Sequence, residues 1–246
     1  MLAFWLDNGG PWDVLRGWTQ LDPDTRQSYL DAYHKAGKIV LVSAFGATEW
    51  PTRDGIDPIT SANRIADFVI QFGLDGVDVD YEDSDAFNAG TAEQWLITYT
   101  KTLRLRLPAS RYTISHAPQA PYFFPNSYPG GGYLAVHKAV GGMIDFYNVQ
   151  FYNQGSLSYD TCQSLFYDAQ GSSVFEIARN GVPLNKIVVG KPITHQGAVN
   201  SGYMDPWKLA ACIPDAKAKG WSGGVMGWQY SLDPSFQWIS AVSSQL

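Results

Sequence analysis

Charge is scarce in this sequence, and the scarcity excludes several classes of protein. Charged residues make up 16% of the 246 positions, against about 25% in an average soluble domain. The formal net charge is −6, and the lysines and arginines form no cluster. Because binding to phosphate backbones needs a concentrated basic patch, no nucleic-acid partner is expected.

Long apolar runs and a leader segment are also missing. No stretch approaches the roughly 18 consecutive apolar residues of a membrane span, so no membrane partner is expected. The first residues, MLAFWLDN, lack a basic region, a long apolar region and a small-residue cleavage site, so this chain shows no signal segment. We still expect a secreted, extracellular protein whose targeting segment lies outside this sequence.

Cysteines are few. The sequence has only Cys162 and Cys212, too few for a disulfide scaffold or a zinc site, and neither a metal nor a cofactor is expected. If the two paired, they would close a loop of about 50 residues, and the chain-entropy model gives about 4 kcal/mol for such a bond. The sequence leaves this disulfide and two buried free thiols equally open.

Aromatic residues and a repeating order of elements are what the sequence does have. Aromatics make up 14% of the chain, with 9 Trp and 14 Tyr, a balance that suits secreted proteins handling neutral ligands such as sugars. Short β-branched runs alternate with amphipathic helical stretches, which predicts βα units around a parallel sheet. Seven strands are expected, at residues 2–6, 38–44, 75–80, 111–116, 145–151, 186–191 and 223–229.

The chain shows no internal boundary. No linker, low-complexity segment or repeat divides it, so a single domain over residues 1–246 is expected. A Pro/Gly/aromatic loop at residues 121–133 follows a strand directly. In a barrel of βα units, that is the face where ligands bind, although a purely structural turn is equally compatible with the sequence.

The most informative stretch is LDGVDVDYEDSD, residues 74–85. In a strand, alternate side chains share a face, so Asp78, Asp80 and Glu82 line one side while Val77 and its alternating neighbours line the other. Acids spaced roughly 6 to 7 Å apart affect each other's protonation, so at least one should keep its proton unusually high in pH. A carboxylic acid that is protonated near neutrality is what a general acid for glycoside cleavage requires. The acids after Glu82 are expected to be solvated rim residues in a loop.

Other interpretations of this acidic stretch fit less well. An EF-hand beginning at Asp78 would need Gly at its sixth position and Glu at its twelfth, where the chain has Asp83 and Ala89. A phosphatase-like D-x-D-x-T would need Thr in place of Glu82, and no phosphate-binding loop is present. A solvated loop is contradicted by the valines that alternate with the acids. A buried, acid-lined strand is therefore expected.

Residues 75–82, DGVDVDYE, resemble the D-G-x-D-x-D-x-E signature of glycoside hydrolase family 18, which contains chitinases and certain endo-β-N-acetylglucosaminidases. The resemblance implies an α/β fold, a TIM (β/α)8 barrel with this motif on its fourth strand. It also implies that Glu82 is the general acid, that Asp80 orients and stabilises the substrate's 2-acetamido group, and that Asp78 shares a proton or hydrogen bond with Asp80. In this family the N-acetyl carbonyl is the nucleophile, and water opens the resulting oxazolinium ion with retention.

Other segments resemble the same family in the same order. Residues 150–153, QFYN, resemble its sixth-strand Q-x-Y-N pattern, which implies that Tyr152 binds the acetamido oxygen and that Gln150 and Asn153 line the same subsite. Residues 223–228 resemble the eighth strand, which implies that Trp228 forms the floor beneath the cleaved sugar. Tyr122 is a candidate for a further subsite, with packing as the alternative.

The sequence departs from the family pattern in two places. The third-strand S-x-G-G appears as Ser43-Ala44-Phe45-Gly46, with Phe45 in place of Gly. Counting back from the acidic strand makes residues 2–6 the second strand, so the family's first strand has no counterpart, and the resulting exposed edge would favour association of an otherwise monomeric protein. The short stretch before the last strand leaves no room for a chitinase insertion domain, and no carbohydrate-binding module is expected.

The resemblance predicts a retaining endo-glycosidase that hydrolyses β-1,4 linkages between N-acetylglucosamine units by substrate-assisted catalysis. Its partner would be an N-acetylglucosamine-containing polysaccharide or glycan. One alternative is an endo-β-N-acetylglucosaminidase acting on N-glycan cores. Another is a catalytically inactive sugar-binding, lectin-like or inhibitor-like protein on the same fold.

Overall fold

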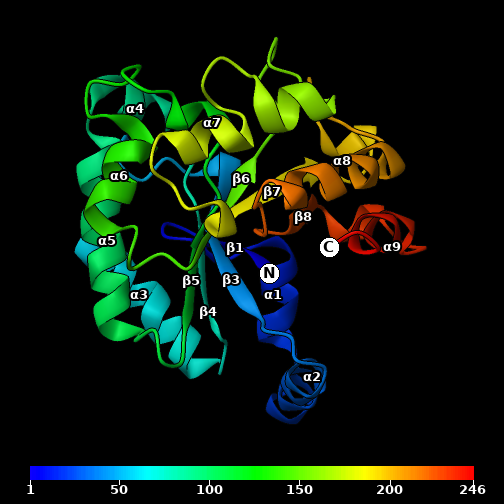
Figure 1. Ribbon diagram of the computed structural model, residues 1–246. Helices are drawn as coiled ribbons and strands as arrows, with labels where there is room; N and C mark the ends of the chain where they lie inside the picture. The colour runs from blue at the N-terminus through cyan, green and yellow to red at the C-terminus, as the bar shows by residue number, and fades with distance from the viewer. The chain divides into compact units, whose positions relative to one another are not determined.

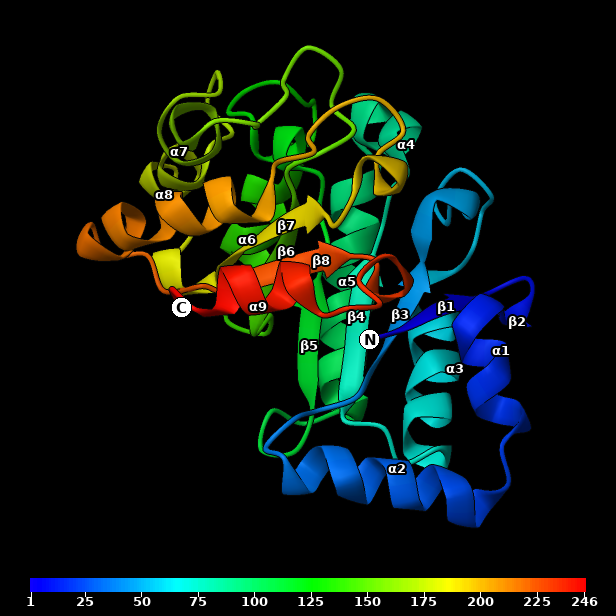
Figure 2. The ribbon, with the colours of Figure 1, turned by 90° about the vertical axis from the view of Figure 1, so that its right-hand side faces the viewer.

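The computed structural model describes residues 1–246, which group into two compact units (Figures 1 and 2). The first unit is formed by Met1–Ala117 and Lys138–Asp145, and the second by Pro118–His137 and Phe146–Leu246. Each unit is therefore built from two stretches of the chain. None of the helices has both the length and the apolar character that crossing a membrane would require. The single domain expected from the sequence stays a prediction.

The first unit contains a five-stranded sheet in the order β2-β1-β3-β4-β5. Its strands are β1 (Leu2–Leu6), β2 (Gly10–Pro11), β3 (Leu41–Phe45), β4 (Gly76–Asp80) and β5 (Thr113–His116). Four of them pair in parallel, and β2 pairs antiparallel with β1. β2 is an addition to the seven predicted strands, and it covers the edge of β1 opposite β3 over two residue pairs.

Five helices belong to the first unit: α1 (Asp13–Gln20), α2 (Pro23–Lys35), α3 (Pro58–Gln71), α4 (Ser84–Ala89) and α5 (Ala92–Arg106). α3 and α5 lie side by side along one side of β3 to β5, as both views show. Their apolar faces, including Ile65 and Leu103, are fully buried. This burial anchors the helices against one face of the sheet, so the opposite face of β4 points away from them.

The second unit contains three parallel strands in the order β6-β7-β8. These are β6 (Phe146–Gln150), β7 (Ile187–Pro192) and β8 (Val225–Trp228). Its helices are α7 (Val174–Arg179), α8 (Pro206–Ala218) and α9 (Gln237–Ser243), while α6 (Gly132–Val140) spans the change from one unit's segment to the next. α8 and α9 lie against each other in both views.

Three helices begin with the same two-residue signal. An Asp-Pro pair starts α2, α3 and α8, with the aspartates Asp22, Asp57 and Asp205 as N-caps. Each aspartate accepts a hydrogen bond from a backbone N–H in the first turn, and the proline takes the position where no N–H partner exists. The sequence therefore fixes these helix starts locally.

Cys162 and Cys212 form a disulfide whose Cα atoms are 5.4 Å apart. The bond joins the chain just before the short π-helical turn Gln163–Tyr167 to the middle of α8. Of the two alternatives that the sequence left open, the structure has the disulfide. Both cysteines lie in the second unit, so the bond is a restraint within that unit.

Candidate active site

The acidic motif lies on β4, and strand register places its first inward acid between two serines. Ser43 of β3 and Ser115 of β5 both pair with Asp78. The Ser43 hydroxyl donates to one carboxylate oxygen of Asp78 at 2.9 Å, and the Ser115 hydroxyl donates to the other at 2.6 Å. Asp78 is 3% exposed. Two hydroxyl donors therefore hold both oxygens of this buried acid in one orientation.

The opposite face of β4 is apolar, as the alternation predicts. Val77, Val79 and Tyr81 are fully buried. The Tyr81 ring packs edge-on against Phe87, and its hydroxyl lies 2.6 Å from the Thr52 hydroxyl. The predicted division of this strand into an acidic and an apolar face is thus confirmed, and it follows from the period of two in strand side chains.

The acids become more accessible along the motif. Asp80, the last residue of β4, is 8% exposed, and Glu82, two residues later, is partly exposed. The row therefore runs from a buried acid with two fixed donors to an acid that solvent or a ligand can reach. Such a gradient suits a proton donor at the accessible end and charge stabilisation beneath it. The elevated proton affinity expected for one of these acids stays a prediction.

Asp83 differs from the sequence-based expectation. The predicted position in a solvated rim loop is wrong, because Asp83 is 0% exposed. Its carboxylate accepts hydrogen bonds from the Ala86 N–H at 3.1 Å, as the N-cap of α4, and from the Arg53 N–H at 2.8 Å. A helix that begins at Ser84 needs this cap, and that helix was not among the predicted elements. Asp85 is exposed, as expected.

Gly76 fixes the register of β4 at its other end. It has a φ of +148°, and a Cβ there would overlap the carbonyl oxygen of Thr113 on β5. Only glycine permits this approach of the two backbones. The adjacent Asp75 carboxylate accepts the Val40 N–H at 2.7 Å and lies 2.9 Å from Nε2 of His34. The first two residues of the motif are thus structural, and they align Asp78 with its two serines.

Phe45 occupies the position where the family pattern has a glycine. Its φ is +75°, a conformation that glycine adopts without strain. Its ring is fully buried and lies 5.7 Å from the Trp95 ring and 5.5 Å from the Tyr99 ring. Packing on α5 therefore holds a larger side chain in a backbone conformation that favours glycine.

In the second unit, the QFYN segment lies where β6 ends. Gln150 is the last residue of β6, and Tyr152, two residues further, is 5% exposed. Asn153 has a φ of +59°, and its amide oxygen accepts the Val199 N–H at 2.7 Å. That oxygen is thus used to fix the loop after β7. The ligand contacts expected for Gln150, Tyr152 and Asn153 stay predictions.

Two further predicted site residues have different environments. Trp228 ends β8, pairs with Pro192 of β7 and is partly exposed, as a residue that contacts a ligand must be. Tyr122 is 2% exposed and packs against the rings of Tyr128 and Tyr133 at 6.0 and 6.3 Å. Tyr122 is thus in packing contact with these rings, and its role in a further subsite stays a prediction.

Lys191 was not identified from the sequence. It lies on β7, is 0% exposed, and donates from Nζ to the carbonyl oxygens of Phe151 at 2.8 Å and Tyr159 at 2.9 Å. Burial lowers the pKa of Lys191 to about 7, against the weaker opposing effect of Asp160. A lone lysine within the apolar run IVVGKP was the available signal. No group of three or more His, Cys, Asp and Glu residues that could hold a metal ion occurs.

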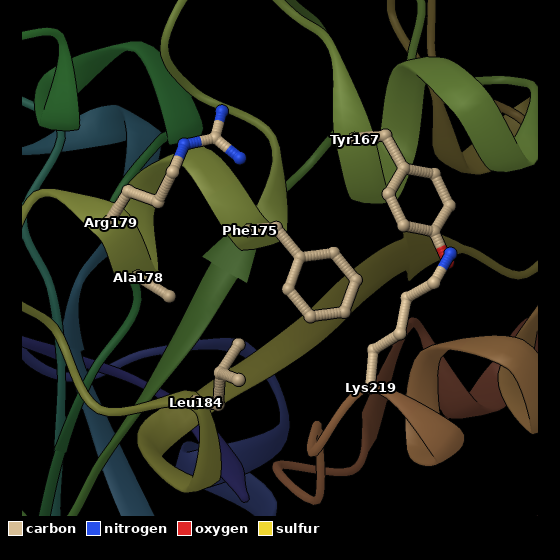
Figure 3. Close-up of a pocket in the computed structure, with 6 residues that line it drawn as sticks. All are labelled: Tyr167, Phe175, Ala178, Arg179, Leu184 and Lys219. Atoms are coloured by element: carbon tan, nitrogen blue, oxygen red, sulfur yellow. The ribbon is translucent and has the colours of Figure 1, made fainter.

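One open pocket lies on the outer part of the second unit (Figure 3). It has a volume of about 460 Å³. Leu184, just before β7, and Lys219, just after α8, both line it, so it lies towards the N-terminal ends of the strands. Its remaining lining residues are Tyr167, Phe175, Ala178 and Arg179. None of the predicted site residues lines this pocket, and Gln150 and Trp228 end their strands at the other side of this unit.

Comparisons with known proteins give a consistent result. No family model matches the chain. The crystal structure of a GH18 chitinase from Pseudoalteromonas aurantia is 31% identical, with a TM-score of 0.81 over 96% of this chain and 84% of that one. A class III chitinase of Arthroderma benhamiae is 29% identical over 229 residues, 80% of this chain and 62% of the relative.

A second curated relative matches over a shorter range. Endochitinase 2 of Coccidioides posadasii is 29% identical over 162 residues, which are 63% of this chain and 17% of the relative. The chain thus spans less than two thirds of the length of these curated relatives.

The fold and the acidic strand define an α/β protein of the TIM-barrel glycosidase class, as predicted. The likeness to the Pseudoalteromonas enzyme extends over nearly the whole chain, at an identity and coverage that are sufficient to establish kinship. The chain belongs to glycoside hydrolase family 18.

Proposed function

We propose that the chain is a retaining endo-chitinase that hydrolyses β-1,4 linkages between N-acetylglucosamine units. The observation that carries the proposal is the acid row of β4, in which Asp78 is held by Ser43 and Ser115 while Glu82 is accessible. Structural and curated relatives that are themselves chitinases support the substrate.

In the proposed mechanism, Glu82 donates its proton to the glycosidic oxygen as the bond to C1 breaks. The carbonyl oxygen of the substrate's own N-acetyl group attacks C1 and forms an oxazolinium ion. Water, deprotonated by the Glu82 carboxylate, then opens this ion with retention of configuration. Asp80 stabilises the positive charge that develops on the acetamido nitrogen.

The remaining residues have supporting roles in this proposal. Asp78 accepts a hydrogen bond or shares a proton with Asp80, and the serines on both sides keep it from turning away. Tyr152 donates to the acetamido oxygen, and Trp228 stacks beneath the sugar ring, where an indole face offers a broad apolar contact. Gln150 and Asn153 line the acetamido subsite.

The assignment of Glu82 is tested by Glu82→Gln, which keeps the size of the side chain and removes the acid. Turnover of a chitotetraose derivative should fall by at least about 100-fold, because general acid catalysis contributes about 10² to 10⁴. Binding of the oligosaccharide, measured by calorimetry, should persist. Asp85→Asn, an exposed acid in the same segment, is the matched control and should keep wild-type turnover.

The products of the wild-type chain test the function itself. Cleavage within chitin oligosaccharides supports the proposal, whereas cleavage only of a high-mannose glycoprotein would replace it with an N-glycan endo-β-N-acetylglucosaminidase. Binding without any turnover would make the chain a sugar-binding relative. Wild-type turnover by the Glu82→Gln variant would refute the mechanism.

The location of the protein is part of the proposal. We infer an extracellular, secreted and monomeric protein that meets its polysaccharide outside the cell. The disulfide supports this inference, because such bonds form and persist in oxidising compartments. Recovery of the protein from the cytosol, with both thiols reduced, would contradict it.

A further inference from the structure

The segment that contains Tyr152 is held at both of its ends by one buried amine. β7 pairs with β6, and the Phe151 N–H donates to the Gly190 carbonyl oxygen at 3.2 Å, directly before Lys191. The Lys191 ammonium reaches back to the carbonyl oxygens of Phe151 and Tyr159, at 2.8 and 2.9 Å. These two carbonyls lie on either side of Tyr152 and of the loop that follows it.

The two ends that Lys191 joins are themselves rigid. Phe151 and Tyr159 are fully buried, and their rings meet edge-on with centroids 5.3 Å apart. The Tyr159 hydroxyl is 2.6 Å from the hydroxyl of Ser172. The lysine thus connects one end fixed by the sheet to another fixed by the unit's interior, and Tyr152 directly follows the first of these ends.

An apolar side chain on β7 would be the ordinary choice for a site like that of Lys191. Both hydrogen-bond partners of Lys191 are neutral carbonyls, and the Asp160 carboxylate offsets only part of the loss of hydration of its charge. Desolvation is accordingly the main reason that its pKa is lowered. Burying this charge costs free energy, so its contacts should provide a compensating benefit. The benefit that they offer is the link between the backbones of Phe151 and Tyr159.

Tyr152 is also packed closely by a glycine. Gly202, in the loop after β7, has a φ of +96°, and a Cβ there would overlap the Tyr152 Cα and lie 2.5 Å from its Cβ. The same loop is fastened to the residue after Tyr152, because the Asn153 N–H donates to the Ser201 carbonyl oxygen at 2.9 Å. The Lys191 bridge and the Gly202 loop thus both contact the backbone around Tyr152, and a Cβ at Gly202 would also lie 2.9 Å from the Phe151 carbonyl oxygen that Lys191 holds.

We propose that Lys191 and Gly202 are positioning residues for Tyr152, and that their bridge and close approach set where its hydroxyl lies. The inference rests on the proposed function, in which Tyr152 binds the acetamido oxygen. Neither residue touches the substrate. They act through the backbone of Tyr152. Displacement of this backbone would weaken binding of the transition state more than binding of the ground state.

The test is a double-mutant cycle between Lys191→Met and Tyr152→Phe. Lys191→Met keeps the apolar stem and removes the three donors. It should lower kcat on a chitotetraose derivative about 10- to 100-fold, since a displacement of about 1 Å in a site costs up to about 100-fold, while KM changes less than about threefold. In the Tyr152→Phe background, Lys191→Met should cost less than about twofold more. Lys208→Met, an exposed lysine of α8, is the matched control and should behave as wild type.

Gly202→Ala is the second variant, because Lys191→Met could fail to fold. It disturbs the Tyr152 backbone through a different contact, and it should show the same loss of kcat and the same lack of effect in the Tyr152→Phe background. Wild-type kcat in both variants, or losses that multiply with that of Tyr152→Phe, would overturn the proposal. Unfolding of both variants at the assay temperature would assign the two residues to stability alone and would overturn it as well.

A readout that does not depend on turnover separates this inference from the proposed function. The ring resonance of Tyr152 is identified in the spectrum of tyrosine-labelled protein by its absence from Tyr152→Phe. Lys191→Met should shift this resonance, and Lys208→Met should leave it in place. An unmoved resonance refutes the positioning role, whereas a wild-type chain without turnover refutes the function and leaves the resonance test standing.

Discussion

The burial of Lys191 predicts an unusual rise of stability with pH. The pKa of Lys191 is lowered to about 7 in the folded chain, against 10.5 for an ordinary lysine. Between these values the unfolded chain holds a proton that the folded chain has released, so raising the pH favours the folded chain. The full difference corresponds to about 5 kcal/mol, at about 1.36 kcal/mol per pH unit.

Between pH 7 and pH 9, this effect should raise the free energy of unfolding by about 2 kcal/mol. Urea denaturation at these two pH values measures it, in wild type, Lys191→Met and Lys208→Met. The pH range should stay below about 10. Burial raises the pKa of Tyr159 to about 12, so above about pH 10 this tyrosine ionises first in the unfolded chain, and stability then falls with pH.

The variants isolate the lysine from other groups that titrate in the same range. Lys191→Met should remove the rise, since methionine has no proton to release. Lys208→Met should keep it, because its ammonium is exposed. If the curves of wild type and Lys191→Met run parallel from pH 7 to pH 9, the lysine is not buried as described, and the reasoning built on its cost fails.

Three further predictions follow from the site and the disulfide. Asp80→Asn should lower kcat by at least about 100-fold and leave KM nearly unchanged, because its charge acts mainly in the transition state; equal changes in both, measured by steady-state kinetics, would indicate a binding role. Replacing both Cys162 and Cys212 with serine opens a loop of 50 residues and should cost about 4 kcal/mol in urea denaturation; a loss below about 1 kcal/mol would contradict the chain-entropy argument. Gly76→Ala should destabilise the chain by about 3 kcal/mol or more, because its Cβ would overlap the Thr113 backbone; an unchanged melting temperature would be incompatible with the register of β4.

Much of the fold could be predicted because local patterns agree with it. The seven predicted strands are all present, and the chief displacement is β3, which begins at Leu41 rather than at residue 38. Apolar runs identify buried strands well, and the Asp-Pro pairs identify helix starts. The missed elements include α1, with eight residues, and the shorter β2 and α4, which have two and six residues and depend on pairing or capping rather than on hydrophobic period.

The candidate site was predictable where it lies on a strand and much less so where it depends on loops. The face shared by Asp78 and Asp80 follows from alternation alone. The two serines that fix Asp78 come from other strands, and only the register brings them to it. Gly202 had no sequence signal, because its contact with Tyr152 joins two loops some fifty positions apart. The burial of Asp83 depends on α4, which was not predicted.

The division of each unit into two stretches also sets the order in which the units can form during synthesis. Asp145 completes the first unit: its carboxylate accepts the Ile114 N–H at 2.7 Å and pairs with Arg104 at 2.8 Å. When residue 145 leaves the ribosome, residues 118–137 have already emerged, although the strands of their own unit have not. The nascent chain can therefore complete the first unit while residues 118–137, which belong to the second unit, form an insertion in its sequence. No single truncation point yields both units intact.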